Sequence, residues 1–228
     1  MLLRRRIRQV HRLLGLVVFI QLLFWVGGGL TMAFLGLDEV RGAHRKAEPV
    51  TVDLRMAESL FPVTSVLANV EYPVRSVQLD LVAGNPVYRV TLADGLRLFD
   101  AVGGQRLNPI DASLALAVAR ADYRGDLSNA APVWVTEAHY EVRGRDLPLW
   151  RIDTGDDLET RIYVSPQSGE VVARRNRLWR IFDFVWMLHI MDYEQRSDFN
   201  HPLLVGFAFT TLLFVLSGLW MLVLAYRR

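Results

Sequence analysis

Two long stretches without a charged side chain constrain the fold of this chain more than any other feature. Residues 13–37 and residues 203–225 hold no Asp, Glu, Lys or Arg. Each stretch exceeds the roughly 20 apolar residues that a helix needs to cross a bilayer. The first is also longer than the roughly 7 to 15 apolar residues of a cleaved signal peptide, and no small-x-small cleavage site follows it. We therefore predict two transmembrane helices, at 13–37 and 201–225, with membrane lipids around them.

Basic residues flank both predicted helices on the side of the chain ends. They are Arg4, Arg5, Arg6, Arg8 and Arg12 before the first helix and Arg227 and Arg228 after the second. The positive-inside rule then predicts that both termini are cytoplasmic and that residues 38–200 lie on the outer side of the membrane. Attraction to anionic lipid headgroups accounts for arginines next to a span, so we expect no nucleic-acid partner.

The absence of cysteine excludes several kinds of chemistry. The chain cannot form disulfides, thiolate metal sites, iron–sulfur clusters, c-type haem attachments or a cysteine nucleophile. Neither a HExxH nor a GxSxG motif is present, so a hydrolase is poorly supported. Any metal must be held by His, carboxylate, Met or Tyr side chains.

The region between the two spans contains an internal repeat. An acid-started helical stretch followed by alternating strands occurs twice, with aligned positions 58 to 64 residues apart. The first copy comprises DLRMAESLF from Asp53, VYRVTL (87–92) and LRLFDAVGGQRL (96–107), and the second comprises DASLALAVARADY from Asp111, LWRIDT (149–154) and TRIYVSPQSGEVV (160–172). VRSVQLDLV (74–82) and PVWVTEAHYEV (132–142) add one strand to each copy.

These patterns predict an α+β outer domain made of two helix-plus-antiparallel-sheet repeats between two transmembrane helices. Each helix is expected to be capped by its aspartate and to cover one face of a small sheet. The predicted segments are a cytoplasmic basic tail 1–12, a transmembrane helix 13–37, repeats 38–108 and 109–175, an apolar interfacial helix and loop 176–200, a transmembrane helix 201–225 and a tail 226–228.

The segment LWRIFDFVWMLHIM, residues 178–191, is too short to span a membrane and too apolar to lie free in water. Apart from Arg180 and Asp183, which are one turn apart and able to pair, its helical wheel is apolar all round. We predict a helix buried between the membrane and the outer domain. Asn200 is then expected to cap the second span, with Pro202 in its first turn.

His11 begins a stripe on the first predicted span. His11, Gly15 and Trp25 fall near one line of the helix, together with Val18, Leu22, Gly29 and Gly36. Glycine beside a ligand leaves room for a porphyrin edge, and glycine along a face also lets another helix approach closely. His11 itself is either an interfacial side chain among arginines or an imidazole ligand of haem iron.

Three further histidines are candidate ligands on the outer side. His189 shares a helical sector with Phe182 and Val185, where an imidazole either finds a structural partner or binds iron. His201 starts the second span at the outer surface, and His44 follows the first span on the same side. The acidic residues Asp192, Glu194 and Asp198 form either a solvated loop or a surface that attracts iron.

His139 lies in EAHYE, where Glu137 and Glu141 would share its strand face. A solvated strand face is the favoured interpretation there, and a metal site is the alternative.

The doubled unit ending in DAVGGQRL and VSPQSGEVV resembles the PepSY module. The opening HRLLGL, the MLH before the second span and the two flanking spans are similar to the PepSY-associated transmembrane family, over essentially the whole chain. That family includes reductases of the bacterial inner membrane that act on ferric siderophores and carry b-type haem. PepSY modules also occur in peptidase-inhibiting propeptides. Many such reductases have four or more spans, whereas two are predicted here.

The resemblance and the histidines together predict an inner-membrane haem b protein that passes electrons outward to ferric iron or a ferric siderophore. His11 would bind an inner haem, His189 with His201 or His44 an outer one, and Trp25 would line the gap. A bis-histidine haem in a four-helix bundle then requires a homodimer, because each chain has two spans and one inner histidine. The cytoplasmic electron donor is open. The alternative is a membrane-tethered PepSY sensor or peptidase regulator without enzymatic activity.

Overall fold

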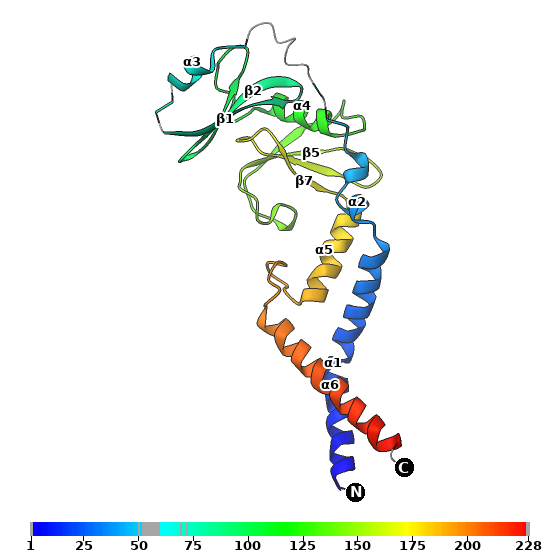
Figure 1. Ribbon diagram of the computed structural model, residues 1–228. Helices are drawn as coiled ribbons and strands as arrows, with labels where there is room; N and C mark the ends of the chain where they lie inside the picture. The colour runs from blue at the N-terminus through cyan, green and yellow to red at the C-terminus, as the bar shows by residue number, and fades with distance from the viewer. Residues whose placement is uncertain (1, 50, 52–59, 69, 72, 227–228) are drawn as a thin grey trace. The chain divides into compact units, whose positions relative to one another are not determined.

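The chain forms two compact units in a computed structural model (Figure 1). The helical unit comprises residues 1–37 and 178–228, and the sheet unit comprises residues 38–177. The structure describes residues 2–49, 51, 60–68, 70–71 and 73–226. The predicted helix that starts at Asp53 and the terminal Arg227 and Arg228 fall mostly or wholly outside these residues.

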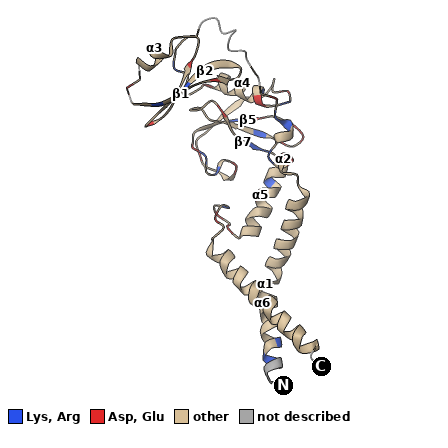
Figure 2. Ribbon diagram, viewed as in Figure 1, with Lys and Arg blue, Asp and Glu red and all other residues tan. Residues whose placement is uncertain are grey.

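Three helices build the helical unit: α1 (Leu2–Phe34), α5 (Arg177–Ile190) and α6 (Pro202–Tyr226). Two of them, over Arg5–Phe34 and Pro202–Tyr226, are long and apolar enough to cross a membrane. Figure 2 shows basic residues at the N-terminal end of α1 and none along the rest of α1 or the described length of α6. Both predicted apolar helices are thus confirmed as helices. The first ends at Phe34, three residues earlier than predicted.

Helix α5 lies alongside α1 (Figure 1). The Gln21 side chain donates a hydrogen bond from Nε2 to the Leu188 carbonyl, and the Trp25 indole donates from Nε1 to the His189 carbonyl, both at 2.8 Å. The last carbonyls of a helix have no partner within that helix, so these two α1 side chains satisfy the C-terminal end of α5. Residues 178–190 of the predicted segment 178–191 are thus helical, with α1 as a packing partner, but the helix is not buried all round, because Ile181 and Phe184 are exposed.

Two antiparallel sheets build the sheet unit. The first has the order β1-β2-β3, and the second has the order β4-β5-β6-β7. Their bounds are β1 Val74–Val82, β2 Asn85–Leu92, β3 Gly95–Asp100, β4 Pro132–Val135, β5 Leu149–Asp153, β6 Arg161–Val164 and β7 Val171–Arg175. The short helices are α2 (Leu37–Val40), α3 (Val63–Ala68), and the 3-10 turns Ala43–Arg45 and Tyr140–Val142.

A helix packs on each sheet, but only the helix of the second sheet is the predicted one, since α3 of the first sheet begins at Val63, after the predicted stretch from Asp53. Helix α4 (Ala112–Asp122) is capped by Asp111, whose side chain accepts a hydrogen bond from the Leu114 amide at 2.8 Å. Its buried residues pack with those of the second sheet. On the first sheet, Val66 of α3 packs with Tyr88, Val90 and Phe99. The mixed helix-and-sheet fold is confirmed.

The predicted strand 132–142 is too long. Strand β4 ends at Val135, and the chain then turns through His139, which precedes the 3-10 turn Tyr140–Val142. The reason is the carboxylate of Glu141, which is fully buried and bonded to Tyr163 and Arg161. In a regular strand, Glu141 would lie on the face that it was predicted to share with Glu137 and His139. In this segment the Glu141 carboxylate points into the protein instead.

Candidate functional site

His11 of α1 is half-buried and packs against α6. Its Nδ1 lies 2.8 Å from the Ser217 Oγ, and its ring stacks on Phe214 with centroids 4.4 Å apart and planes 11° apart. Two glycines permit this approach. A Cβ at Gly15 would lie 3.0 Å from the Phe214 ring, and a Cβ at Gly218 would lie 3.2 Å from the His11 ring. Of the two roles predicted for Gly15, the structure therefore shows the close approach of a helix.

His189 lies in the last turn of α5 and faces aromatic neighbours. Its ring centroid is 6.4 Å from that of Trp186, with planes 14° apart, and 6.4 Å from that of Trp25. Its Nδ1 is buried and has no hydrogen-bond partner among the described residues. The structure thus brings together two predicted site residues, His189 and Trp25. A buried imidazole nitrogen without a partner is unfavourable, and a bound ligand would remove that cost.

The aromatic contacts continue along α5. Phe182 and Trp186 have centroids 6.5 Å apart with planes 14° apart, so that Phe182, Trp186 and His189 follow one face at helical spacing. A cavity of about 290 Å³ opens beside this row. Its lining consists of Trp179, Phe182, Asp183, Trp186 and Arg196. Asp183 and Arg196 form an ion pair there, which joins α5 to the following loop.

His201 directly precedes α6, which begins at Pro202. His201 rather than the predicted Asn200 thus occupies the residue before the helix, and its carbonyl accepts the Val205 amide at 3.1 Å. The Nδ1 of His201 is buried and, like that of His189, lacks a hydrogen-bond partner in the part of the chain that the structure describes.

The acidic residues between these two histidines have different roles. Asp192 is buried, and its two oxygens accept hydrogen bonds from the backbone of the loop 194–198. Desolvation acts to raise the pKa of this carboxyl, but the hydrogen bonds from Asp198, Ser197 and Gln195 outweigh it and lower the pKa well below its usual value. Asp192 therefore organises the loop. Of the three acids named above, only Glu194 and Asp198 are exposed.

The predicted residues of the helical unit lie at two levels. His11 precedes Trp25 by 14 residues on one helix, a rise of about 21 Å at 1.5 Å per residue. Because Trp25 contacts His189, that rise also separates the His11 level from the His189 level along α1. Trp25 thus lies beside the outer histidine and not midway between the two.

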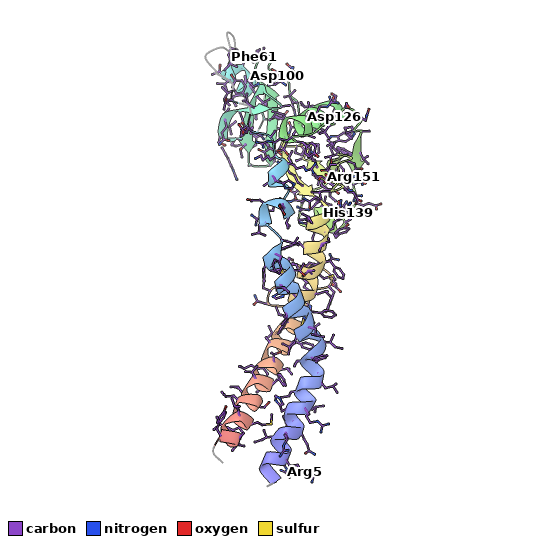
Figure 3. All side chains as sticks on the ribbon, turned by 90° about the vertical axis from the view of Figure 1, so that its right-hand side faces the viewer. Arg5, Phe61, Asp100, Asp126, His139 and Arg151 are labelled. Atoms are coloured by element: carbon purple, nitrogen blue, oxygen red, sulfur yellow. The ribbon has the colours of Figure 1, made fainter. Side chains whose placement is uncertain are left out.

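The two remaining histidines belong to the sheet unit. His44 is exposed in the 3-10 turn Ala43–Arg45. His139, labelled in Figure 3, accepts a hydrogen bond at Nδ1 from the Glu141 amide at 3.4 Å. The prediction that Glu137 and Glu141 share a strand face with His139 is wrong. The Glu141 carboxylate is instead buried and bonded to Tyr163 at 2.5 Å and to Arg161 at 3.2 Å. Among the described residues, no group of three or more His, Asp or Glu side chains could hold a metal ion.

Several residues at the site were missed or undervalued by sequence reasoning. Ser217, Gln21 and Phe214 are not among the site residues predicted from the sequence. A signal was present for two of them, because a polar side chain inside an uncharged span usually faces another helix and not lipid. Phe214 gave none, since every turn of α6 offers large apolar side chains.

The chain matches no protein-family model, and no curated protein or solved structure is similar enough to count as a match.

Proposed function

We propose that this chain is a haem b protein of the bacterial inner membrane that passes electrons from the cytoplasmic side to reduce ferric iron, free or siderophore-bound, at the outer face. The observation that carries the proposal is the pair of imidazoles on either side of one loop, His189 and His201. Each has a buried Nδ1 without a partner in the described chain. Imidazole is the most common haem ligand, and a haem iron bound to both nitrogens would give each Nδ1 a partner.

An inner site is the second part of the proposal. His11 would bind the iron there, because it is the one histidine in the sequence of α1. A groove of about 590 Å³ lies on the same turns of α1, but His11 is not among its lining residues, which are Gln9, Arg12, Leu13, Gly15, Leu16 and Phe19. The His11 ring instead faces Ser217 and Phe214 of α6.

At the outer level, His189 would be one iron ligand and His201 or His44 the other. Trp186 and Trp25 would cover the flat faces of the group. When bound, haem iron accepts and releases one electron at a time. The net reaction proposed is the transfer of one electron from a reduced donor on the cytoplasmic side to one Fe³⁺, which leaves as Fe²⁺ while the donor is oxidised by one electron.

The membrane placement follows from the two spans and their flanks. Helices α1 and α6 expose large apolar side chains along their lengths, which a bilayer would cover. Under the positive-inside rule, the arginines at the N-terminal end of α1 support cytoplasmic termini and a periplasmic sheet unit. A homodimer would supply the four helices and the second inner histidine that one chain lacks.

The test is an optical spectrum of the full chain purified in detergent from cells supplied with a haem precursor. We expect a Soret band and, after dithionite reduction, the α and β bands of haem b. His11→Ala and His189→Ala should each lose part of the haem, whereas His139→Asn, which keeps an acceptor at the turn, should lose none. A His44→Ala and His201→Ala pair identifies the second outer ligand.

Full haem retention in both His11→Ala and His189→Ala would refute this ligand assignment. A colourless wild-type protein would refute the haem proposal and leave the tethered PepSY sensor or regulator, in which the histidines are structural.

A further inference from the structure

A chain of two short contacts links α1 to α6 through Ser217. The His11 Nδ1 lies 2.8 Å from the Ser217 Oγ, and the Ser217 Oγ lies 2.7 Å from the Phe214 carbonyl oxygen. Both distances are those of well-formed hydrogen bonds. Ser217 is half-buried, and the surrounding residues of α6 are apolar, so no other polar side chain of that helix competes for the hydroxyl at this level.

The direction of these bonds follows from counting protons. A carbonyl oxygen only accepts, so the single hydroxyl proton of Ser217 must be donated to Phe214. The bond between Ser217 and His11 then requires a proton on the imidazole Nδ1. A neutral imidazole carries one N–H, and the other nitrogen keeps its lone pair. In neutral His11, therefore, Nε2 is the nitrogen that can bind a metal.

The same segment of α6 also fixes the plane of the ring. Phe214 stacks on the His11 face, while Ser217, three residues further along, holds its edge. Gly218 lies so close that a Cβ there would be 3.2 Å from the His11 Cε1. One turn of α6 thus restricts both the tautomer and the rotation of the imidazole.

We propose that Ser217 is the positioning residue of His11, holding it as the Nδ1–H tautomer and so leaving Nε2 as the nitrogen that can bind haem iron. The metal-binding part of this inference rests on the proposed function. A hydrogen bond to the second nitrogen of a ligand imidazole fixes its orientation and increases its basicity, and losing such a partner typically weakens metal binding about 10- to 100-fold. A simple contact that only holds two helices together would have no such effect on the metal.

The experiment compares the full chain with Ser217→Ala, Ser217→Thr and Thr210→Ala. Thr210 is the matched control, because its hydroxyl bonds only to the Gly206 carbonyl of its own helix at 2.8 Å. The first measurement is ¹⁵N NMR of histidine side chains in the haem-free protein, with His11→Ala used to assign the signals. We expect protonated Nδ1 and bare Nε2 for His11 in the wild type, Ser217→Thr and Thr210→Ala, and a loss of this preference in Ser217→Ala.

The second measurement uses haem-loaded protein. Ser217→Ala should bind haem about tenfold more weakly and shift the inner midpoint potential to more positive values, because a less basic ligand stabilises ferric iron less. Ser217→Thr should restore both values, and circular dichroism should show equal helix content in all variants.

The outcomes separate the two proposals. Coloured wild-type protein with an unchanged His11 tautomer and potential in Ser217→Ala overturns the role of Ser217 and leaves the haem proposal standing. Colourless wild-type protein overturns the haem proposal, and with it the ligand role of His11. A His11 that is protonated at Nε2 in the wild type overturns the inference whatever the colour.

Discussion

The Asp192 carboxylate is a single residue that determines the shape of a whole loop. One oxygen accepts the amides of Glu194 and Gln195 at 3.3 and 3.0 Å, and the other accepts those of Ser197 and Asp198 at 2.9 and 3.1 Å. The loop also places the Arg196 carbonyl where the Trp186 indole donates to it at 3.2 Å. Asp192 therefore supports the aromatic row beside His189 through the backbone.

Asp192→Asn should loosen this loop. The amide nitrogen that replaces one oxygen cannot accept, so two backbone N–H groups of exposed residues exchange their partner for water, at about 0.5–1.5 kcal/mol for each lost hydrogen bond. Hydrogen exchange of residues 194–198 is the measurement, and protection there should fall while α1 stays protected. Asp198→Asn is the control, since Asp198 is exposed and one of its oxygens accepts the Asn200 amide at 2.8 Å. Equal protection in both variants would contradict this role.

The pH dependence of the same loop has a definite sign. Because the folded state lowers the pKa of Asp192, its contribution to stability is present above the unfolded pKa of about 3.9 and is lost as the pH falls through the lower folded pKa. Protection factors of the loop should therefore stay constant from neutral to mildly acidic pH and fall only in strong acid.

Glu141 shows why single residues limited prediction from the sequence. The alternation of residues 132–142 favours a strand, but the pattern does not reveal that Glu141 finds Tyr163 and Arg161 from a neighbouring strand. In the fold, burial and the hydrogen bond to Glu141 raise the pKa of Tyr163, so the phenol stays protonated and donates. A buried carboxylate with partners 20 and 22 residues away depends on tertiary contacts that no local pattern encodes.

At the scale of elements, helix α1 contacts α5 through a glycine. Gly28 is buried, and a Cβ there would lie 3.0 Å from a Val185 methyl group. Gly27, its neighbour, is exposed and has no atom within 4 Å of such a Cβ. The two positions share almost the same helical context but differ in whether another helix approaches them.

Gly28→Ala should therefore be destabilising relative to Gly27→Ala. Both changes favour the helix by up to about 1 kcal/mol, but only the first overpacks the interface, at about 1–3 kcal/mol. Thermal unfolding in detergent, followed by near-ultraviolet circular dichroism, gives the unfolding midpoint of each variant. The difference between the two midpoints reports the overpacking alone, because both variants gain the same helix propensity. Equal midpoints in the two variants would mean that α5 does not pack closely on Gly28.

Elements with a strong local signal were predicted well. Strand β1 spans the predicted residues 74–82, and α4 starts after the predicted Asp111 cap, because alternation and capping act within a few residues. The packing face of α6 could not be predicted. Its half-buried positions recur at helical spacing, but all faces of this helix are apolar, so periodicity is hidden in the sequence. The contact of His11 with Ser217 and Phe214 shares this difficulty.

At the scale of the whole molecule, the repeat produces a single sheet unit with a shared core. Val82 and Leu98 of the first sheet belong to the same buried cluster as Ile152 and Ile162 of the second. The buried Arg89 joins the sheets as well, with bonds to Asp80 at 2.6 Å and to the Ser168 carbonyl at 2.7 Å. Neither repeat is therefore a separate domain, which the spacing of the two copies did not reveal.

The helical unit, by contrast, is incomplete for the proposed haem function. Each chain brings one histidine, His11, to the level of Ser217, whereas a haem with two imidazole ligands needs two. Twofold symmetry would place a second His11 opposite the first and provide four spans. The outer site makes no such demand, since His189 and its second ligand come from the same chain in the proposal.

Mixed dimers separate these two sites. When wild-type chains and His11→Ala chains with a different tag are co-expressed and doubly purified, we expect the mixed dimer to lose inner haem while keeping outer haem. Native mass spectrometry should give two chains per particle, with the haem lost in a mixed dimer equal to that lost when both chains carry His11→Ala. Half of that loss would mean that each His11 binds haem without the His11 of the other chain. Single chains with a full haem content would contradict the dimer, because the inner iron would then have both its ligands within one chain.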